Sequence, residues 1–209
     1  MPEGPEVFIL AEVLKCLNMK AEAYGKHLLY TNPEGRNYDI TFGLVGKISL
    51  LKLDNGYDIQ KTVNTPLSGD IRFIPDFSSI KTNLGINWMT CEKEEVKKVV
   101  VEWSTRAKKI GALLLEQGEI CGIGVAWGSE ILHSAEIMPT DLANTINVDK
   151  LVDSIMIKQA YIREAYLNCI DGDYEYFVSR WFGNIYKTRH MEIYKKGKEV
   201  MVSGRKFYI

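Results

Sequence analysis

The sequence predicts an α+β protein in which a leading helix is followed by a sheet, a group of helices and a terminal hairpin. Three observations carry this prediction: apolar residues at helical spacing after residue 5, short β-rich runs between residues 26 and 86, and longer helical patterns from residue 91 onward. With 209 residues, 46% of them hydrophobic and 25% charged, the chain can bury a core. We therefore expect one or two folded domains.

The first helix is predicted from the pattern that follows Pro5, a residue that suits the first turn of a helix. Glu6 lies next to the positive helix N-terminus, where a negative charge is favourable. Apolar residues then recur three or four positions apart: Val7, Leu10, Ala11, Leu14 and Leu17. This spacing predicts a short amphipathic helix.

Short runs rich in β-branched and aromatic residues predict a sheet after this helix. The runs cover residues 27–31, 38–42, 47–53, 57–63 and 71–74. Turn-forming sequences separate them: Asn-Pro-Glu-Gly at 32–35, Asp-Asn-Gly at 54–56 and Ser-Gly-Asp at 68–70. Five short strands indicate a sheet domain.

Four helices and a small hairpin are predicted in the rest of the chain. Thr90 is the predicted cap of a helix over residues 91–103, and Ser104 or Thr105 that of a second helix through residue 117. The other two helices are predicted over residues 126–135 and 147–169. Three terminal strands are expected, at residues 191–194, 199–202 and 206–209.

Composition excludes several classes of protein. No run approaches the roughly 18 apolar residues of a membrane span, and glutamates at 3, 6 and 12 stand where a secretory signal would be apolar, so we expect an intracellular protein. The cysteines match neither a disulfide scaffold nor a zinc knuckle, and the histidines have no metal-ligand spacing. These residues are Cys16, Cys91, Cys121, Cys169, His27, His133 and His190. We expect free thiols, no metal and no cofactor.

Charge is distributed unevenly along a chain whose formal net charge is −1. Residues 158–209 hold ten Lys or Arg against six Asp or Glu, a net +4, and the rest of the chain carries −5. In this basic segment Lys and Arg alternate with aromatic residues, a composition that suits a polyanion with stackable bases. A solvated hairpin would have the same composition, so the two interpretations stay open.

The glycines at 122, 124 and 128 imitate a dinucleotide-binding loop. Their spacing is Gly-x-Gly-x-x-x-Gly, and the residues before them form a helical pattern, not a strand. We therefore reject a cofactor site and expect a tight turn between two helices, which glycine permits.

The N-terminal sequence Met-Pro-Glu is the remaining candidate for chemistry. Proline at position 2 normally permits removal of Met1, which leaves a secondary α-amine with a reference pKa of about 8. Such an amine can attack an aldehyde-level carbon such as a sugar C1′ to form an iminium, and Glu3 is an adjacent acid. Taken alone, the same tripeptide is more often the start of a helix.

Six motifs, read in order, resemble the formamidopyrimidine-DNA glycosylase and endonuclease VIII family from end to end. They are Met-Pro-Glu-Gly-Pro-Glu-Val at 1–7, Gly-Lys-His-Leu-Leu-Tyr at 25–30, Phe-Gly-Leu-Val-Gly-Lys-Ile at 42–48, Leu-Gly at 84–85, the run from 113 to 139 with its Cys-Gly-Ile-Gly turn, and Ser-Gly-Arg-Lys-Phe-Tyr at 203–208. The Gly-Pro-Glu opening is more similar to the endonuclease VIII branch, whose substrates are chiefly oxidised pyrimidines.

The resemblance implies a catalytic β-sandwich domain over residues 1–88, a helix-two-turns-helix DNA-binding domain over 89–190 and a finger hairpin over 191–209. It also implies the catalytic roles: Pro2 as the Schiff-base nucleophile, Glu3 as the general acid/base, and Lys26 as a strand lysine near the flipped sugar. Leu44 takes the place of the wedge that fills the hole left by the extruded base. The implied DNA contacts are Gly122 and Gly124 of the turn, Lys109, Arg205 and Lys206.

Four departures from the family pattern affect these expectations. Lys26 lies close to the first helix, so strands of the sandwich are missing, and no cysteine follows Cys169, so the hairpin resembles a zincless finger. Val125 replaces the asparagine that follows the glycine turn. The Arg-Arg-Phe-Gly wedge loop is not recognisable in residues 74–81, although Phe77 or Lys81 could replace it.

The sequence therefore predicts a bifunctional DNA glycosylase and AP lyase that removes oxidised bases, pyrimidines first and hydantoins second. The expected partner is damaged DNA, single-stranded or duplex, and unpaired lesions are favoured because the wedge is incomplete. We expect a monomer in the cytoplasm, nucleoid or nucleus. The alternatives are an inactive DNA-binding relative of such enzymes and a structural domain that binds no DNA.

Overall fold

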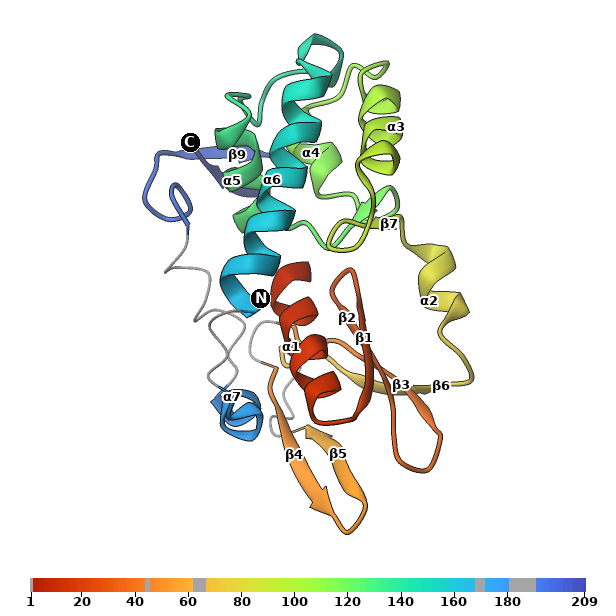
Figure 1. Cartoon of the computed structure of the whole chain (residues 1–209). Coiled ribbons are helices and arrows are strands. Elements are labelled where there is room, and N and C mark those ends of the chain that lie inside the picture. Colours follow the sequence, from red (N-terminus) through yellow and green to blue (C-terminus); the bar gives the residue numbers. More distant parts are fainter. Residues whose placement is uncertain (1, 44–45, 62–66, 168–171, 181–190) are drawn as a thin grey trace. The chain divides into compact units, whose positions relative to one another are not determined.

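The computed structural model describes residues 2–43, 46–61, 67–167, 172–180 and 191–209. These residues form two compact units (Figure 1). The first unit combines Met1–Asn83 with Arg163–Tyr186, and the second combines Leu84–Ile162 with Lys187–Ile209. The α+β class expected from the sequence is confirmed. The first unit ends at Asn83, near the expected domain boundary at residue 88. Residues 163–186, which were expected in the helical domain, belong to the first unit instead.

An antiparallel four-stranded sheet forms the centre of the first unit, in the order β1-β2-β3-β6. Its strands are Lys20–Tyr24, His27–Thr31, Asn37–Ile40 and Ile71–Ile74. The hairpin of β4 (Ile48–Leu53) and β5 (Gly56–Lys61) is separate. Among its described residues, the helices of the unit are α1 (Gly4–Cys16), α2 (Ser78–Asn83) and α7 (Tyr174–Arg180), together with the end of α6 (Val148–Leu167) from Arg163 onward.

Helix α1 packs on β1 because both surfaces are suited to close contact (Figure 1). The helix buries Val7, Leu10 and Leu14 completely. The buried residues of β1 are Ala21 and Ala23, whose small side chains let a helix approach the strand closely. This packing fixes α1 alongside the sheet.

The second unit is mainly helical. Its elements are β7 (Ile86–Asn87), α3 (Lys93–Trp103), α4 (Ile110–Leu114), β8 (Ile120–Cys121), α5 (Val125–Ser134), the 3-10 turn η1 (Ala143–Thr145), α6 (Val148–Leu167), β9 (Glu199–Val202) and β10 (Arg205–Tyr208). Strands β7 and β8 form a short parallel pair, and β9 and β10 form the terminal hairpin. Trp88, Trp103 and Trp127 are buried in the core, and the rings of Trp88 and Trp127 lie 6.2 Å apart.

The strands predicted over residues 27–31, 71–74 and 199–202 are confirmed at both ends. The predicted helix over 104–117 is wrong except for α4, because the backbone of residues 108–110 pairs with residues 141–143 instead. The predicted cap Thr90 is also wrong, since α3 is capped by Glu92. The predicted strand over 191–194 is absent, because three successive N–H groups there bind one carboxylate.

Candidate functional site

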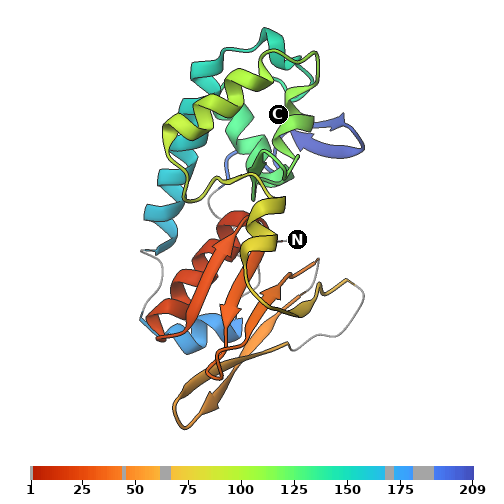
Figure 2. The same ribbon diagram turned by 90° about the vertical axis from the view of Figure 1, so that its right-hand side faces the viewer.

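The topology of the first unit brings its predicted catalytic residues to one end. Helix α1 has 13 residues and runs ~20 Å away from Pro2 and Glu3. The chain then turns back, and the five residues of β1 return over ~17 Å to the turn that holds Lys26. Figures 1 and 2 both show this turn at the end where α1 begins. Pro2, Glu3 and Lys26 therefore share one end of the unit, although they are far apart in an extended chain.

A reciprocal capping box fixes the chain at Pro2 and Glu3. The Glu6 carboxylate accepts the backbone N–H of Glu3 at 2.6 Å, and the Glu3 carboxylate faces the backbone N–H of Glu6 in return. Both side chains are buried, with 5% of Glu3 and 1% of Glu6 exposed. Sequence reasoning treated Glu6 only as a helix-dipole charge, yet the spacing of two glutamates three residues apart at a helix start is the signal that could have identified it.

Lys26 lies in a hairpin turn, so its expected position on a strand is wrong. Tyr24 pairs with His27, which leaves Gly25 and Lys26 as a two-residue loop. Gly25 has φ +58°, and a positive φ at the first central position is the requirement of a type II′ turn. The glycine thus sets the direction in which Lys26, which is half-buried, leaves the sheet.

A buried aspartate lies next to this turn and binds two basic side chains. His27 Nδ1 is 2.7 Å from Asp39 Oδ1, and Arg72 donates to Asp39 Oδ2. Burial would by itself raise the pKa of Asp39, but the hydrogen bonds from His27 and Arg72 outweigh it and lower the pKa below its usual range. The carboxylate therefore holds His27 in one orientation beside Lys26.

Asp39 should make stability depend on pH in the acid range. Because the folded pKa is lowered, its contribution is present above about pH 4 and is lost as the pH falls through the folded pKa. Asp39→Asn should cost about 1–3 kcal/mol of unfolding free energy at pH 6, since the amide cannot accept from both partners. Denaturant unfolding at pH 6 and pH 3 should show this difference shrink. Asp54→Asn, in an exposed turn, is the control, and an equal difference at both pH values would contradict the assignment.

Leu44 lies outside the described residues. Its neighbours Gly43 and Gly46 are closely surrounded by backbone, Gly43 by residues 67–69 and Gly46 by Phe42 and Ser68, with no room for a side chain. Gly46 also donates its N–H to the carbonyl of Phe42 at 2.7 Å. Both ends of the segment that holds the expected wedge are thus fixed to the first unit.

Residues 74–81, where the sequence analysis looked for a wedge loop, form the end of β6, a short connection and the start of helix α2. Asp76 accepts the backbone N–H of Ser78 at 2.7 Å and so starts this helix. Lys81 pairs with Glu22 at 2.8 Å and lies over the ring of Tyr24, so it is bound to the sheet. Phe77 is half-buried near Glu22 and Leu29.

In the second unit, Gln117 builds the glycine turn before α5. Its side-chain oxygen accepts the N–H of Gly122 at 2.8 Å, and its amide donates to the carbonyls of Leu115 and Ile123 at 3.0 Å. Gly122 has φ +98°, and Gly124 is the N-cap of α5. The turn therefore leads directly into a helix N-terminus, a place that favours phosphate. Val125 begins α5 and offers no side-chain donor there.

The three predicted basic contacts differ in how they are paired. Lys109 is exposed at the N-cap of α4 and Arg205 is exposed at the start of β10, and neither forms an ion pair with another described residue. Lys206 pairs with Glu199 at 2.9 Å, which raises the Lys206 pKa. Arg205 follows Ser203 and Gly204, whose φ values of +49° and +74° are those of a type I′ turn.

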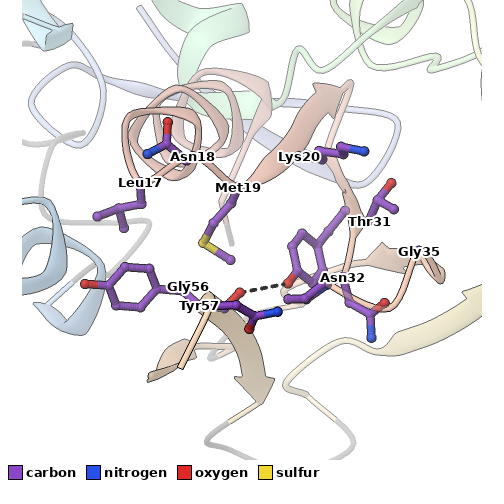
Figure 3. A pocket seen from close by; sticks show the side chains of 12 residues that line it. Leu17, Asn18, Met19, Lys20, Thr31, Asn32, Gly35, Gly56 and Tyr57 are labelled. Atoms are coloured by element: carbon purple, nitrogen blue, oxygen red, sulfur yellow. Dashed lines mark hydrogen bonds between the residues drawn. The ribbon is translucent and has the colours of Figure 1, made fainter. Parts of the chain in front are cut away.

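A cavity of about 460 Å³ lies at the other end of the first unit (Figure 3). It is lined by the residues just after α1 and by the β2–β3 and β4–β5 turns, among them Asn18, Met19, Asn32 and Tyr57. None of the predicted catalytic residues lines it. We therefore assign the cavity no part in the candidate site.

The described part of the chain contains neither a candidate metal site nor a candidate membrane span. No group of three or more potential metal ligands occurs there, and Cys16, Cys91 and Cys121 are free thiols, while Cys169 falls outside it. None of the helices in that part is both long enough and apolar enough to span a membrane.

Comparison with solved structures identifies the fold. No protein-family description and no curated protein matches the chain. The Lactococcus lactis Fpg protein in complex with DNA containing an abasic site is similar at a TM-score of 0.74 and 18% identity, over 99% of this chain and 97% of that one. MutM (Fpg) from Thermus thermophilus is similar at a TM-score of 0.71 and 17% identity, over 99% and 96%. The chain therefore has the fold of these proteins.

Proposed function

We propose that this chain, which shares the fold of the formamidopyrimidine-DNA glycosylases, is a DNA glycosylase with AP lyase activity in base excision repair. The observation that supports this most directly is that Pro2, Glu3 and Lys26 lie at the same end of the first unit. These are the three residues that the motifs mark as catalytic. Helix α1 packs against β1, and this packing supports their position at one end independently of the motifs.

In the proposed reaction, Pro2 without Met1 supplies the nucleophile. Its secondary amine attacks C1′ of a flipped nucleotide, the N–C1′ bond forms, and the glycosidic bond breaks as Glu3 transfers a proton. The damaged base leaves, and the proline nitrogen gives up its proton. The C1′–O4′ bond of the sugar ring then breaks as O4′ takes up a proton, and a cationic iminium joins the opened sugar to the protein. Loss of a C2′ proton then expels the 3′-phosphate and cuts the strand. Lys26 lies at the same end of the unit, where its charge suits a DNA phosphate.

The second unit supplies the DNA contacts in this proposal. Gly122 and Gly124 lead into the N-terminus of α5, and Lys109, Arg205 and Lys206 add positive charge. For the substrate we propose oxidised pyrimidines, in single-stranded or duplex DNA, with hydantoins as a second class. The hairpin is proposed to act without zinc.

Borohydride trapping on a duplex with one abasic site tests the proposed function. A covalent protein–DNA complex is expected, because borohydride reduces the iminium to a stable amine. Binding without trapping would replace the proposal by an inactive DNA-binding relative. Negligible affinity at low salt would leave only a structural domain.

Arg205 should contribute more to DNA binding than its neighbour Lys206. Arg205→Ala should weaken binding and reduce the slope of log K against log salt by about 1, because one phosphate contact is lost. Lys206→Ala should change the slope less, since Lys206 is already paired with Glu199. Titrations of an abasic-site duplex at several salt concentrations measure both slopes. Equal slopes for both variants would show that the Glu199 pair does not matter.

A further inference from the structure

The terminal hairpin is attached to α5 through a buried glutamate. Glu130 is 1% exposed, and its carboxylate accepts three successive backbone N–H groups. Oε2 accepts from Glu192 at 3.0 Å, and Oε1 accepts from Ile193 at 2.8 Å and Tyr194 at 2.9 Å. Lys158 of α6 places its Nζ 3.8 Å from Oε2. The carboxylate is thus surrounded by donors.

This arrangement explains both the burial of the charge and the irregular backbone at 191–194. A buried carboxylate is costly unless donors or an opposite charge compensate it, and here both are present. Successive N–H groups of a strand point in alternating directions, whereas here they converge on one anion, as in an anion-binding nest. The segment we call the hairpin base, residues 191–198, therefore folds around Glu130.

A second attachment lies beside the first, on strand β10, where Tyr208 pairs with Glu199 at the open end of the hairpin. Tyr208 donates its backbone N–H to the Ser129 hydroxyl at 3.0 Å, and this hydroxyl donates to the carbonyl of Val125 at 2.8 Å. Phe207 is completely buried, and a Cβ at Gly111 or Gly128 would lie 3.2 Å from its ring. Helix α5 thus contacts the hairpin through three consecutive residues.

The hairpin depends on these attachments because it is small. Strands β9 and β10 have four residues each, and Lys198 and Ile209 extend the ladder with two backbone hydrogen bonds of 2.9 and 3.0 Å. An isolated two-stranded hairpin is at best marginally stable in water. The direction of its turn, and of Arg205 directly after it, is therefore set from its base.

We propose that Glu130 is the positioning residue of the terminal hairpin, holding the hairpin base so that Arg205 is presented to DNA. The hydrogen bonds of its carboxylate to residues 192–194 fix the hairpin base to α5, as a covalent cross-link would. The part of this inference that concerns DNA rests on the proposed function, whereas the part that concerns the hairpin base does not.

The test compares Glu130→Gln with a matched control, Glu192→Gln. Both changes remove a carboxylate near Lys158, but the Glu192 side chain is 69% exposed and only its backbone enters the nest. Without DNA, Glu130→Gln should speed hydrogen exchange at the amides of residues 192–194 by about tenfold or more, and the control should not. Unchanged exchange in Glu130→Gln would overturn the proposal, whether or not the protein binds DNA.

A double variant tests the link to Arg205. On an abasic-site duplex Glu130→Gln should weaken binding about tenfold, but less than about twofold when Arg205 is already alanine. A tenfold loss in both backgrounds would mean that Glu130 acts on DNA binding by another route.

If Glu130→Gln does not fold, Glu130→Asp keeps the charge but shortens its reach, and should give the same pattern with smaller effects. Wild-type exchange rates in Glu130→Asp would then overturn the proposal. Failure of the wild type to bind DNA would refute the proposed function and leave the exchange result valid.

Discussion

Blocking the Pro2 amine should abolish borohydride trapping on abasic-site DNA, a loss of about 10³-fold or more, the scale on which removal of a covalent nucleophile acts. A chain with residues added before Pro2 carries an amide at that position, and an amide nitrogen cannot form an iminium. Borohydride trapping by the Pro2→Gly variant should also fall sharply. Glycine leaves a primary amine, whose imine must be protonated to become an electron sink, and it removes the ring that fixes the backbone.

Mass spectrometry and two lysine variants make this test specific. The intact mass of the active protein should lack Met1. Lys26→Ala should reduce trapping without abolishing it, and Lys20→Ala, an exposed lysine at the other end of β1, should not change it. Undiminished trapping by the extended chain would rule out Pro2. If Lys26→Ala alone abolished trapping, the nucleophile would be Lys26.

Elements with strong local patterns could be predicted from the sequence, whereas elements specified by distant partners could not. Strand β2, with its run of large apolar residues, was predicted at both ends. Strand β1 was missed because Lys, Ala and Glu, which make up most of it, have low β-propensity, and its conformation comes from pairing with β2. The two-residue strands β7 and β8 form where Gly85 lies close to the backbone of Glu119, a contact that only the fold creates.

The candidate site divides in the same way. Pro2, Glu3 and Lys26 could be proposed from the sequence because each belongs to a short motif, although the turn at Lys26 is seen only from the φ of Gly25. Asp39 and Glu130 could not be found, because a carboxylate in a strand or on a helix resembles a solvent-exposed charge until its partners are known. Those partners, Arg72 for Asp39 and residues 192–194 for Glu130, lie 33 and 62 or more positions away.

Glu3→Gln should separate the two steps of the proposed reaction. Gln keeps the size of the side chain and an oxygen that can face the N–H of Glu6, so the start of α1 is preserved. It cannot transfer a proton to a departing base, so removal of thymine glycol should slow by about 10²–10⁴-fold. Cleavage at a preformed abasic site should slow by less than about tenfold, because the base has already left. Single-turnover rates on the two substrates measure the split.

Glu6→Gln is the matched control for this prediction. Glu6 is also buried in the capping box, and it accepts the N–H of Glu3 through Oε2, a role that the amide oxygen of Gln can keep. Because Glu6 has no part in the proposed proton transfer, both rates should stay within about threefold of the wild type. An equal loss on both substrates in Glu3→Gln would show that Glu3 acts by holding Pro2 in place. The same split in Glu6→Gln would mean that either carboxyl group can supply the proton.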